Sequence, residues 1–161
     1  MNELEKGALK GVKVLDFSTL LPGPLASLFL AETGAEVIKI ERPVTGDEMR
    51  LSHPKWSDES VSFSMLNRGK KSLCLDLKDQ SSKGILKPLI ETADIIIEQF
   101  RPGVMKRLGL DYESIKKINS KIIYVSITGY GQTGPNKMVA GHDLNYIGNT
   151  GLLSLSMGTK G

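Results

Sequence analysis

Short apolar segments that alternate with helix-like segments are the feature that most constrains the fold of this chain. Residues 12–17 are rich in β-branched and apolar side chains, which is typical of a strand. Pro24 suits the first position of a following helix, because its missing N–H would have no partner there, and Gly34 is placed to end that helix. Residues 35–40 form a second apolar segment. This order predicts two parallel strands joined by a crossover helix.

The same alternation continues along the rest of the chain. Strands that alternate with helices predict an α/β fold with a Rossmann-like parallel sheet and flanking helices. The length of 161 residues and the absence of repeats or a linker favour one domain. Further strands are expected at residues 72–75, 94–97 and 121–127, helices at 78–92, 104–108, 112–118 and from about 142, and a loop over 41–60.

Composition excludes several classes of protein. A net charge of +3, without a long basic run or zinc-finger spacing, argues against a nucleic-acid partner, and we expect no metal site. The charged N-terminus is no secretory signal and no apolar run is long enough to span a bilayer, so we expect a cytoplasmic protein. The single Cys74 excludes an internal disulfide and fits a reducing compartment. We expect it to be a small, buried hydrophobic residue in a strand.

Two predicted strand ends on the N-terminal side carry groups of interest, because ligands of open α/β sheets bind outside the carboxyl ends of the strands. Residues 20–24 lack the GxGxxG fingerprint, so the tight pyrophosphate turn of a nicotinamide protein is not supported, and a plain turn explains them equally well. Arg42 offers a planar fork suited to phosphate, and the alternative is a solvated arginine beside Glu41.

Two further segments add positive charge. Residues 67–71 place cations around a glycine, and Lys78 follows them, although such a cluster is more often a wet surface loop. Arg101 follows a predicted strand, and Arg107 lies about one helical turn beyond it. The alternative is that the residues around Arg101 only mark the start of a helix. Together with Arg42, these residues indicate a crevice for a polyanionic, nucleotide-like ligand.

The most chemically suggestive pair is His142 and Asp143, which follow the glycine-rich residues 129–135. The chain has two histidines, and this one lies where a loop feeds a helix start, so it is a candidate for proton transfer. The alternative is that one of the pair merely caps the helix. If both residues are helical, their side chains diverge by about 100° and do not share one task.

These residues resemble the class III CoA-transferase superfamily, also called the CaiB/BaiF family, over nearly the whole chain. The resemblance implies a CoA site lined by Arg42, Leu75, Lys78, Ile96, Arg101 and Arg107, with Leu20 and Pro22 nearby. It also implies an interlocked homodimer with two domains per subunit, in which residues 1–161 are the N-terminal part of the large domain. The matching segments are residues 9–16, 22–24, 34–43, 67–72, 75–78, 100–104, 107–110 and 129–135.

Within that superfamily, Gly141-His142-Asp143-Leu144-Asn145-Tyr146 resembles the α-methylacyl-CoA racemase branch. The resemblance implies an isomerase in which His142 moves the α-proton of a 2-methylacyl-CoA, with a second acid/base aspartate beyond Gly161. In the transferases, the aspartate at the position of Asp143 attacks the thioester, and the residue before it is commonly not histidine. A CoA-binding fragment without activity is the third possibility. In each case the coenzyme is part of the substrate, and no tightly bound cofactor is expected.

Overall fold

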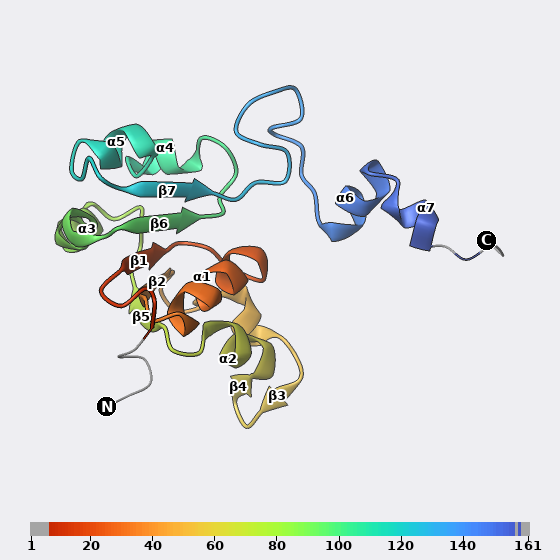
Figure 1. Ribbon diagram of the computed structural model, residues 1–161, viewed down its shortest axis with the longest axis horizontal. Coiled ribbons are helices and arrows are strands. Elements are labelled where there is room, and N and C mark those ends of the chain that lie inside the picture. Colours follow the sequence, from red (N-terminus) through yellow and green to blue (C-terminus); the bar gives the residue numbers. More distant parts are fainter. Residues whose placement is uncertain (1–6, 157, 159–161) are drawn as a thin grey trace. The chain divides into compact units, whose positions relative to one another are not determined.

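The computed structural model describes residues 7–156 and residue 158, and the chain divides into two compact units, Met1–Ile127 and Thr128–Gly161 (Figure 1). The first unit holds a parallel sheet with helices packed on it, and the second holds a glycine-rich loop and two short helices. In chain order the elements are β1 (Lys13–Asp16), α1 (Pro22–Glu32), β2 (Glu36–Glu41), the 3-10 helix η2 (Glu48–Leu51), β3 (Lys55–Trp56), β4 (Glu59–Ser60), α2 (Val61–Asn67), β5 (Lys71–Cys74), α3 (Gln80–Thr92), β6 (Ile95–Glu98), α4 (Val104–Leu108), α5 (Tyr112–Lys116), β7 (Ile123–Ser126), α6 (Asp143–Asn149) and α7 (Leu152–Ser156).

The five-stranded sheet confirms the predicted α/β class. Its strand order is β5-β2-β1-β6-β7, and every neighbouring pair is parallel. The chain runs outward from β1 through β2 to β5, then returns to the other side of β1 to form β6 and β7. The strand order therefore reverses between β1 and β6, and this switch point is where open sheets of this kind bind ligands.

Strict alternation along the strands gives the sheet two different faces. One face packs against α3, α4 and α5 through a large apolar cluster that includes Leu15, Ile96, Leu86 and Ile115. The other face packs against α1 through a smaller cluster built on Val14 and its neighbours. On α3, Leu86 is 1% exposed and belongs to this core.

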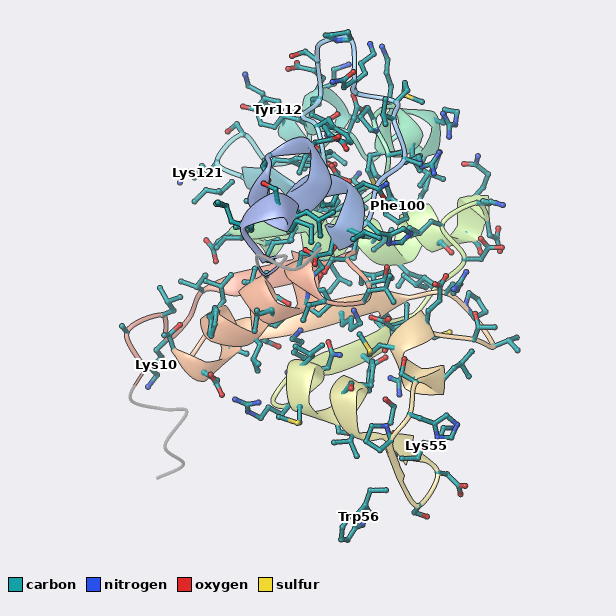
Figure 2. All side chains as sticks on the ribbon, turned by 90° about the vertical axis from the view of Figure 1, so that its right-hand side faces the viewer. Lys10, Lys55, Trp56, Phe100, Tyr112 and Lys121 are labelled. Atoms are coloured by element: carbon teal, nitrogen blue, oxygen red, sulfur yellow. The ribbon has the colours of Figure 1, made fainter. Side chains whose placement is uncertain are left out.

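The segment between β2 and β5 is more ordered than expected. Residues 41–60, which were predicted to be a loop, contain η2 and the β3–β4 hairpin, from which Trp56 projects (Figure 2). Helix α2 was not anticipated either. It is short, and its start depends on Ser60, whose hydroxyl accepts the N–H of Phe63 at 3.3 Å. Weak local signals of this kind fall below what periodicity can detect.

The prediction for Cys74 is wrong in one respect. The residue does lie in a strand, but its side chain is exposed. The reason is the position of β5 at the edge of the sheet, where one side of the strand has no neighbouring strand to cover it. In the part of the chain that the structure describes, no helix is both long and apolar enough to cross a membrane.

Candidate functional site

The switch point between β1 and β6 is bridged by a direct contact. The N–H of Gly23 donates to Oε1 of Gln99, which follows β6, at 3.0 Å. A side chain at Gly23 would place its Cβ 2.1 Å from Cβ of Ser18, so only glycine fits this approach. The contact fixes the start of α1 against the segment after β6.

The first turn of α1 leaves no amide for a phosphate. Pro22 and Pro24 have no N–H, the N–H of Gly23 is bonded to Gln99, and the N–H of Leu25 is bonded to the carbonyl of Leu21. A helix start normally attracts anions through such donors. The residues after β1 are therefore unsuited to the pyrophosphate turn of nicotinamide proteins, in agreement with the missing glycine fingerprint.

Arg42 lies directly after β2, at the carboxyl edge of the sheet, with its guanidinium in a weak local pair. Its Nη2 atom is 2.7 Å from Oε1 of Glu48, and its Nε donates to the carbonyl of Gly46 at 3.1 Å. Both side chains of the ion pair are more than half exposed. Such a pair contributes only about 0–1 kcal/mol, so a phosphate can replace Glu48 at little cost.

The cations of residues 67–71 each have a partner within the fold. Arg68 pairs with Glu32, and Lys71 lies 2.5 Å from Oε1 of Glu36. Lys70 is buried and donates to the carbonyl of Pro24 at 2.8 Å. Neither the ligand interpretation nor the wet-loop alternative describes Lys70, which is a structural residue.

Lys78, Arg101 and Arg107 remain available to a ligand. All three are exposed, and among the described residues their side chains form no ion pair. Lys78 follows β5, while Arg101 and Arg107 follow β6, so all three belong to segments that leave the carboxyl ends of parallel strands. These are the cations best placed to meet an anion at that edge of the sheet.

The apolar residues of the predicted CoA site are distributed differently. Leu20 is half-buried and Pro22 is exposed, both close to the switch point. Leu75 is 7% exposed, and Ile96, in the middle of β6, is completely buried in the core. The side chain of Ile96 packs against the helices of the α3 face and does not line a surface. Its predicted place at the CoA site stays a prediction.

Buried charges under the switch point were missed by sequence analysis. Nζ of Lys39 lies 2.8 Å from Oδ2 of Asp47, and the two side chains are 1% and 0% exposed. Lys70 lies 3.6 Å from Oδ2 of Asp16, again with both side chains buried. Burial lowers the pKa of Lys70 to about 8, against the opposing effect of the Asp16 carboxylate. Lys39 lies two residues after the buried Val37 and therefore on the same face of β2. This position is the sequence feature from which the burial of Lys39 could have been predicted.

A third buried carboxylate ends β2. Glu41 accepts two hydrogen bonds from Arg50, each 2.8 Å long, and one from Ser72 at 2.6 Å. Burial alone would raise the pKa of Glu41, but the hydrogen bonds from Arg50, Ser72 and the backbone of Asp47 outweigh it and lower the pKa to about 2. Glu41 is therefore committed to the fold.

In the second unit, His142 is the N-cap of α6 and Asp143 is its first residue. The N–H of His142 donates to Oδ1 of Asn145 at 2.9 Å, which is half of a capping box. Both His142 and Asp143 are exposed. The helix start at residue 142 confirms the prediction. His142 is thus the cap residue that the alternative interpretation of the pair expected.

Tyr146 fixes the loop in front of α6. Its hydroxyl donates to the carbonyl of Gly141 at 2.8 Å, and its ring lies 5.4 Å from that of Tyr130 in an edge-on pair. A Cβ at Gly129 would come within 2.3 Å of the Tyr146 hydroxyl, and a Cβ at Gly141 within 2.8 Å of its ring. These two glycines therefore make room for the tyrosine, which sequence analysis did not identify. The positions of Gly141 and Tyr146 on either side of the helix start are the sequence feature from which this contact could have been predicted.

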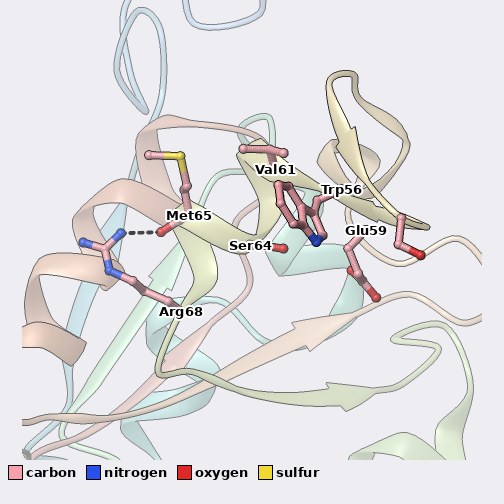
Figure 3. A pocket seen from close by; sticks show the side chains of 7 residues that line it. Trp56, Glu59, Val61, Ser64, Met65 and Arg68 are labelled. Atoms are coloured by element: carbon pink, nitrogen blue, oxygen red, sulfur yellow. Dashed lines mark hydrogen bonds between the residues drawn. The ribbon is translucent and has the colours of Figure 1, made fainter.

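One separate pocket lies in the first unit, with a volume of about 560 Å³ (Figure 3). It contains none of the residues expected to bind CoA. Among the described residues, no group of three or more His, Cys, Asp or Glu side chains is arranged to hold a metal ion. The pocket is lined by Trp56, Ser57, Glu59, Val61, Ser64, Met65 and Arg68.

Comparison with known proteins gives a consistent result. Residues 9–161 match the profile of CoA-transferase family III. The chain is 46% identical to an acetyl-CoA:oxalate CoA-transferase of Acetobacter aceti, covering 81% of this chain and 33% of that protein. It is 44% identical to a mouse succinyl-CoA:glutarate CoA-transferase (92% and 34% covered) and 37% identical to the human alpha-methylacyl-CoA racemase (91% and 35% covered).

Solved structures agree with the sequence relatives. The crystal structure of a CaiB/BaiF family protein from Brucella suis matches with a TM-score of 0.85 and 38% identity, over 90% of this chain and 39% of that chain. A hypothetical protein from Mycobacterium tuberculosis matches with a TM-score of 0.84 and 39% identity, over 91% of this chain and 40% of that one. The chain spans about a third of the length of the curated relatives it matches.

Proposed function

Because the chain belongs to CoA-transferase family III, we propose that the full-length protein is an α-methylacyl-CoA racemase-like isomerase acting on a 2-methylacyl-CoA thioester. The observation that carries this proposal is His142, an exposed imidazole at the start of α6, directly before Asp143. A relative named as an alpha-methylacyl-CoA racemase, 37% identical over 91% of the chain, supports it.

The proposed reaction is a proton transfer at the carbon next to the thioester carbonyl. The neutral imidazole of His142 takes the α-proton, and the electron pair of the C–H bond moves to give an enolate with its charge on the thioester oxygen. Imidazole suits this task because it accepts and returns a proton near neutral pH. Reprotonation from the opposite face by a second acid inverts the centre. Asp143 orients the imidazole or contacts the thioester.

Solvent exchange tests this assignment in the full-length protein. In D2O, the wild type should replace the α-proton of 2-methylacyl-CoA with deuterium, observed by mass spectrometry. His142→Ala should lower that rate at least 100-fold, because general acid–base catalysis contributes roughly 10²–10⁴-fold. His53→Ala is the matched control, since His53 is the only other histidine and is also exposed. Exchange that is unchanged in His142→Ala excludes the imidazole as the base.

The CoA site is proposed on the first unit, with Arg42, Lys78, Arg101 and Arg107 contacting the phosphates. The support is their exposure in segments that follow strand carboxyl ends. Arg101→Gln should weaken CoA binding about tenfold in calorimetry, because a charge-assisted hydrogen bond is worth roughly 1.5–3 kcal/mol. Lys121→Gln is the control, because this exposed lysine precedes β7 and so belongs to the opposite edge of the sheet. Equal losses in both variants would indicate only a general charge effect.

A CoA-transferase is the second candidate, favoured by the higher identities to transferases, 46% and 44% against 37% for the racemase. In this reaction the carboxylate of Asp143 attacks the thioester carbonyl, the C–S bond breaks, and CoA leaves as the thiolate. The product is an acyl–aspartyl anhydride. Hydroxylamine trapping after incubation with succinyl-CoA or acetyl-CoA, followed by peptide mapping, would place a modified residue at Asp143. A modified Asp143 without α-proton exchange selects the transferase. The interlocked homodimer stays a prediction in both cases.

A further inference from the structure

The turn that follows β1 is held by buried charges from a distant segment. Leu20 has a φ of +62°, a left-handed conformation that side chains other than glycine disfavour. Its N–H donates to Oδ1 of Asp47 at 3.1 Å. Two residues earlier, the carbonyl of Ser18 accepts a hydrogen bond from Nζ of Lys39 at 2.7 Å. The turn is therefore bonded to one carboxylate and one ammonium at its two ends.

The two charges that hold the turn also form an ion pair with each other. Nζ of Lys39 and Oδ2 of Asp47 are 2.8 Å apart, and both side chains are essentially inaccessible to solvent. Oδ1 of Asp47 also accepts the N–H of Met49 at 2.9 Å, so the carboxylate is fixed from several directions. An ion pair at this depth adds little net stability, because removing both charges from water costs about as much as their attraction returns. Its most evident effect is to fix the groups it bonds.

The turn occupies a position that matters for a ligand. It leaves β1 at the switch point, and α1, which follows it, is tied through Gly23 to Gln99 after β6. Leu20 itself is half-buried and Leu21 is exposed, so the turn reaches the surface, whereas Lys39 and Asp47 do not. Any contact with a ligand is therefore made by the turn, and the buried pair acts only through it.

We propose that Asp47 is a positioning residue that holds Leu20 and its turn in the conformation that accepts the coenzyme, while Lys39 balances the buried charge of Asp47. This inference rests on the proposed CoA site. When the acceptor at Asp47 is lost, the left-handed conformation of Leu20 has no hydrogen bond to offset its strain, and the turn relaxes toward negative φ. The surface offered to CoA then changes, although neither Asp47 nor Lys39 touches the ligand.

Two double variants of the full-length protein separate positioning from a purely structural role. Lys39→Met/Asp47→Asn and Lys39→Met/Asp47→Ala both remove the two charges, so neither leaves an unpaired buried ion. They differ in one respect: the asparagine keeps an oxygen that can accept the N–H of Leu20, and the alanine has none. The Asn variant is thus the conservative rescue, and thermal unfolding of both measures any general loss of stability.

Two readouts are compared at a temperature where both variants are folded. Hydrogen exchange of the peptide covering residues 17–23 should be about tenfold faster in the Ala variant, since a single hydrogen bond is worth roughly a factor of ten. Calorimetric titration with CoA should show about tenfold weaker binding in the Ala variant, while the Asn variant stays within a factor of three of the wild type. This combination supports the proposal.

Two results overturn it. Equal exchange in both variants means that Asp47 does not hold the turn. Faster exchange with unchanged CoA affinity means that the turn is held but does not serve the coenzyme. Failure of the proposed CoA site itself is recognised separately, because the wild type would then show no binding to CoA in the same titration.

Discussion

Gly23→Ala is the substitution that most sharply tests the packing at the switch point. The added Cβ would lie 2.1 Å from Cβ and 2.2 Å from Oγ of Ser18, whereas non-bonded carbon atoms prefer about 3.5–4.0 Å. Ser18 is fully buried, and its N–H and hydroxyl both donate to Oδ1 of Asp16, so it cannot move without breaking those bonds. The same Cβ would approach Oε1 of Gln99, the acceptor for the N–H of Gly23, to 2.9 Å.

The magnitude follows from these contacts. Overpacking a close-packed interior costs about 1–3 kcal/mol. Losing a hydrogen bond to the buried Asp16 carboxylate adds roughly 1.5–3 kcal/mol. A total of about 2.5–6 kcal/mol is a large part of the 5–15 kcal/mol by which domains are ordinarily stable. Gly23→Ala should therefore unfold at a much lower urea concentration than the wild type.

Gly84→Ala is the matched control, because it makes the same chemical change in α3, where a Cβ meets no atom within 4 Å. Alanine is a better helix former than glycine by about 0.8–1.0 kcal/mol, so this variant should be more stable than the wild type. Both are measured by urea unfolding followed by circular dichroism. A Gly23→Ala variant as stable as the wild type, or equal destabilisation by the two substitutions, would refute the reasoning.

Three further predictions concern other parts of the chain. Because the pKa of Glu41 is lowered to about 2 from its ordinary 4.5, the stability that its carboxylate confers is complete above pH 4.5 and is lost as the pH falls toward 2. Arg50→Ala removes the main hydrogen-bond donor to Glu41, so it should flatten this pH dependence of stability in acid unfolding curves. Gly129→Ala should displace the ring of Tyr146 and slow α-proton exchange severalfold with little change in melting temperature, whereas an unchanged rate would disconnect this loop from the site. Cys74 should react with a thiol reagent in the native protein to one equivalent, and a reaction that requires denaturant would contradict its exposure.

The elements that the sequence predicts well are those fixed by local chemistry. The strands at β1, β2 and β6 are apolar and β-branched, and each was expected within one or two residues of its observed bounds. The start of α6 at His142 was also expected, because the residues there combine a cap with a preceding glycine-rich loop. The parallel order followed from the alternation of strand and helix alone.

The charged residues were predicted less well, because their surroundings decide what they do. Arg42, Lys70 and Arg101 look alike in sequence, as cations near strand ends. In the fold, Arg42 forms a weak, exposed ion pair, and Arg101 is exposed. Lys70 is instead buried and donates a hydrogen bond to the carbonyl of Pro24. A cation becomes structural when a carbonyl or carboxylate lies within its reach after folding, and that partner can be anywhere along the chain.

The pair of Lys39 and Asp47 shows how far such reasoning can be extended. The phase of Lys39 in β2, two residues after the buried Val37, requires an acceptor for its ammonium, because an unpaired charge in the core would cost several kcal/mol. What the phase cannot reveal is which carboxylate supplies it, since Asp47 is brought there by an irregular loop. A strand pattern thus predicts that a partner exists, and only the tertiary structure identifies it. The same partner also bonds the turn after β1, so the residue hardest to predict is the one on which the geometry of the switch point depends.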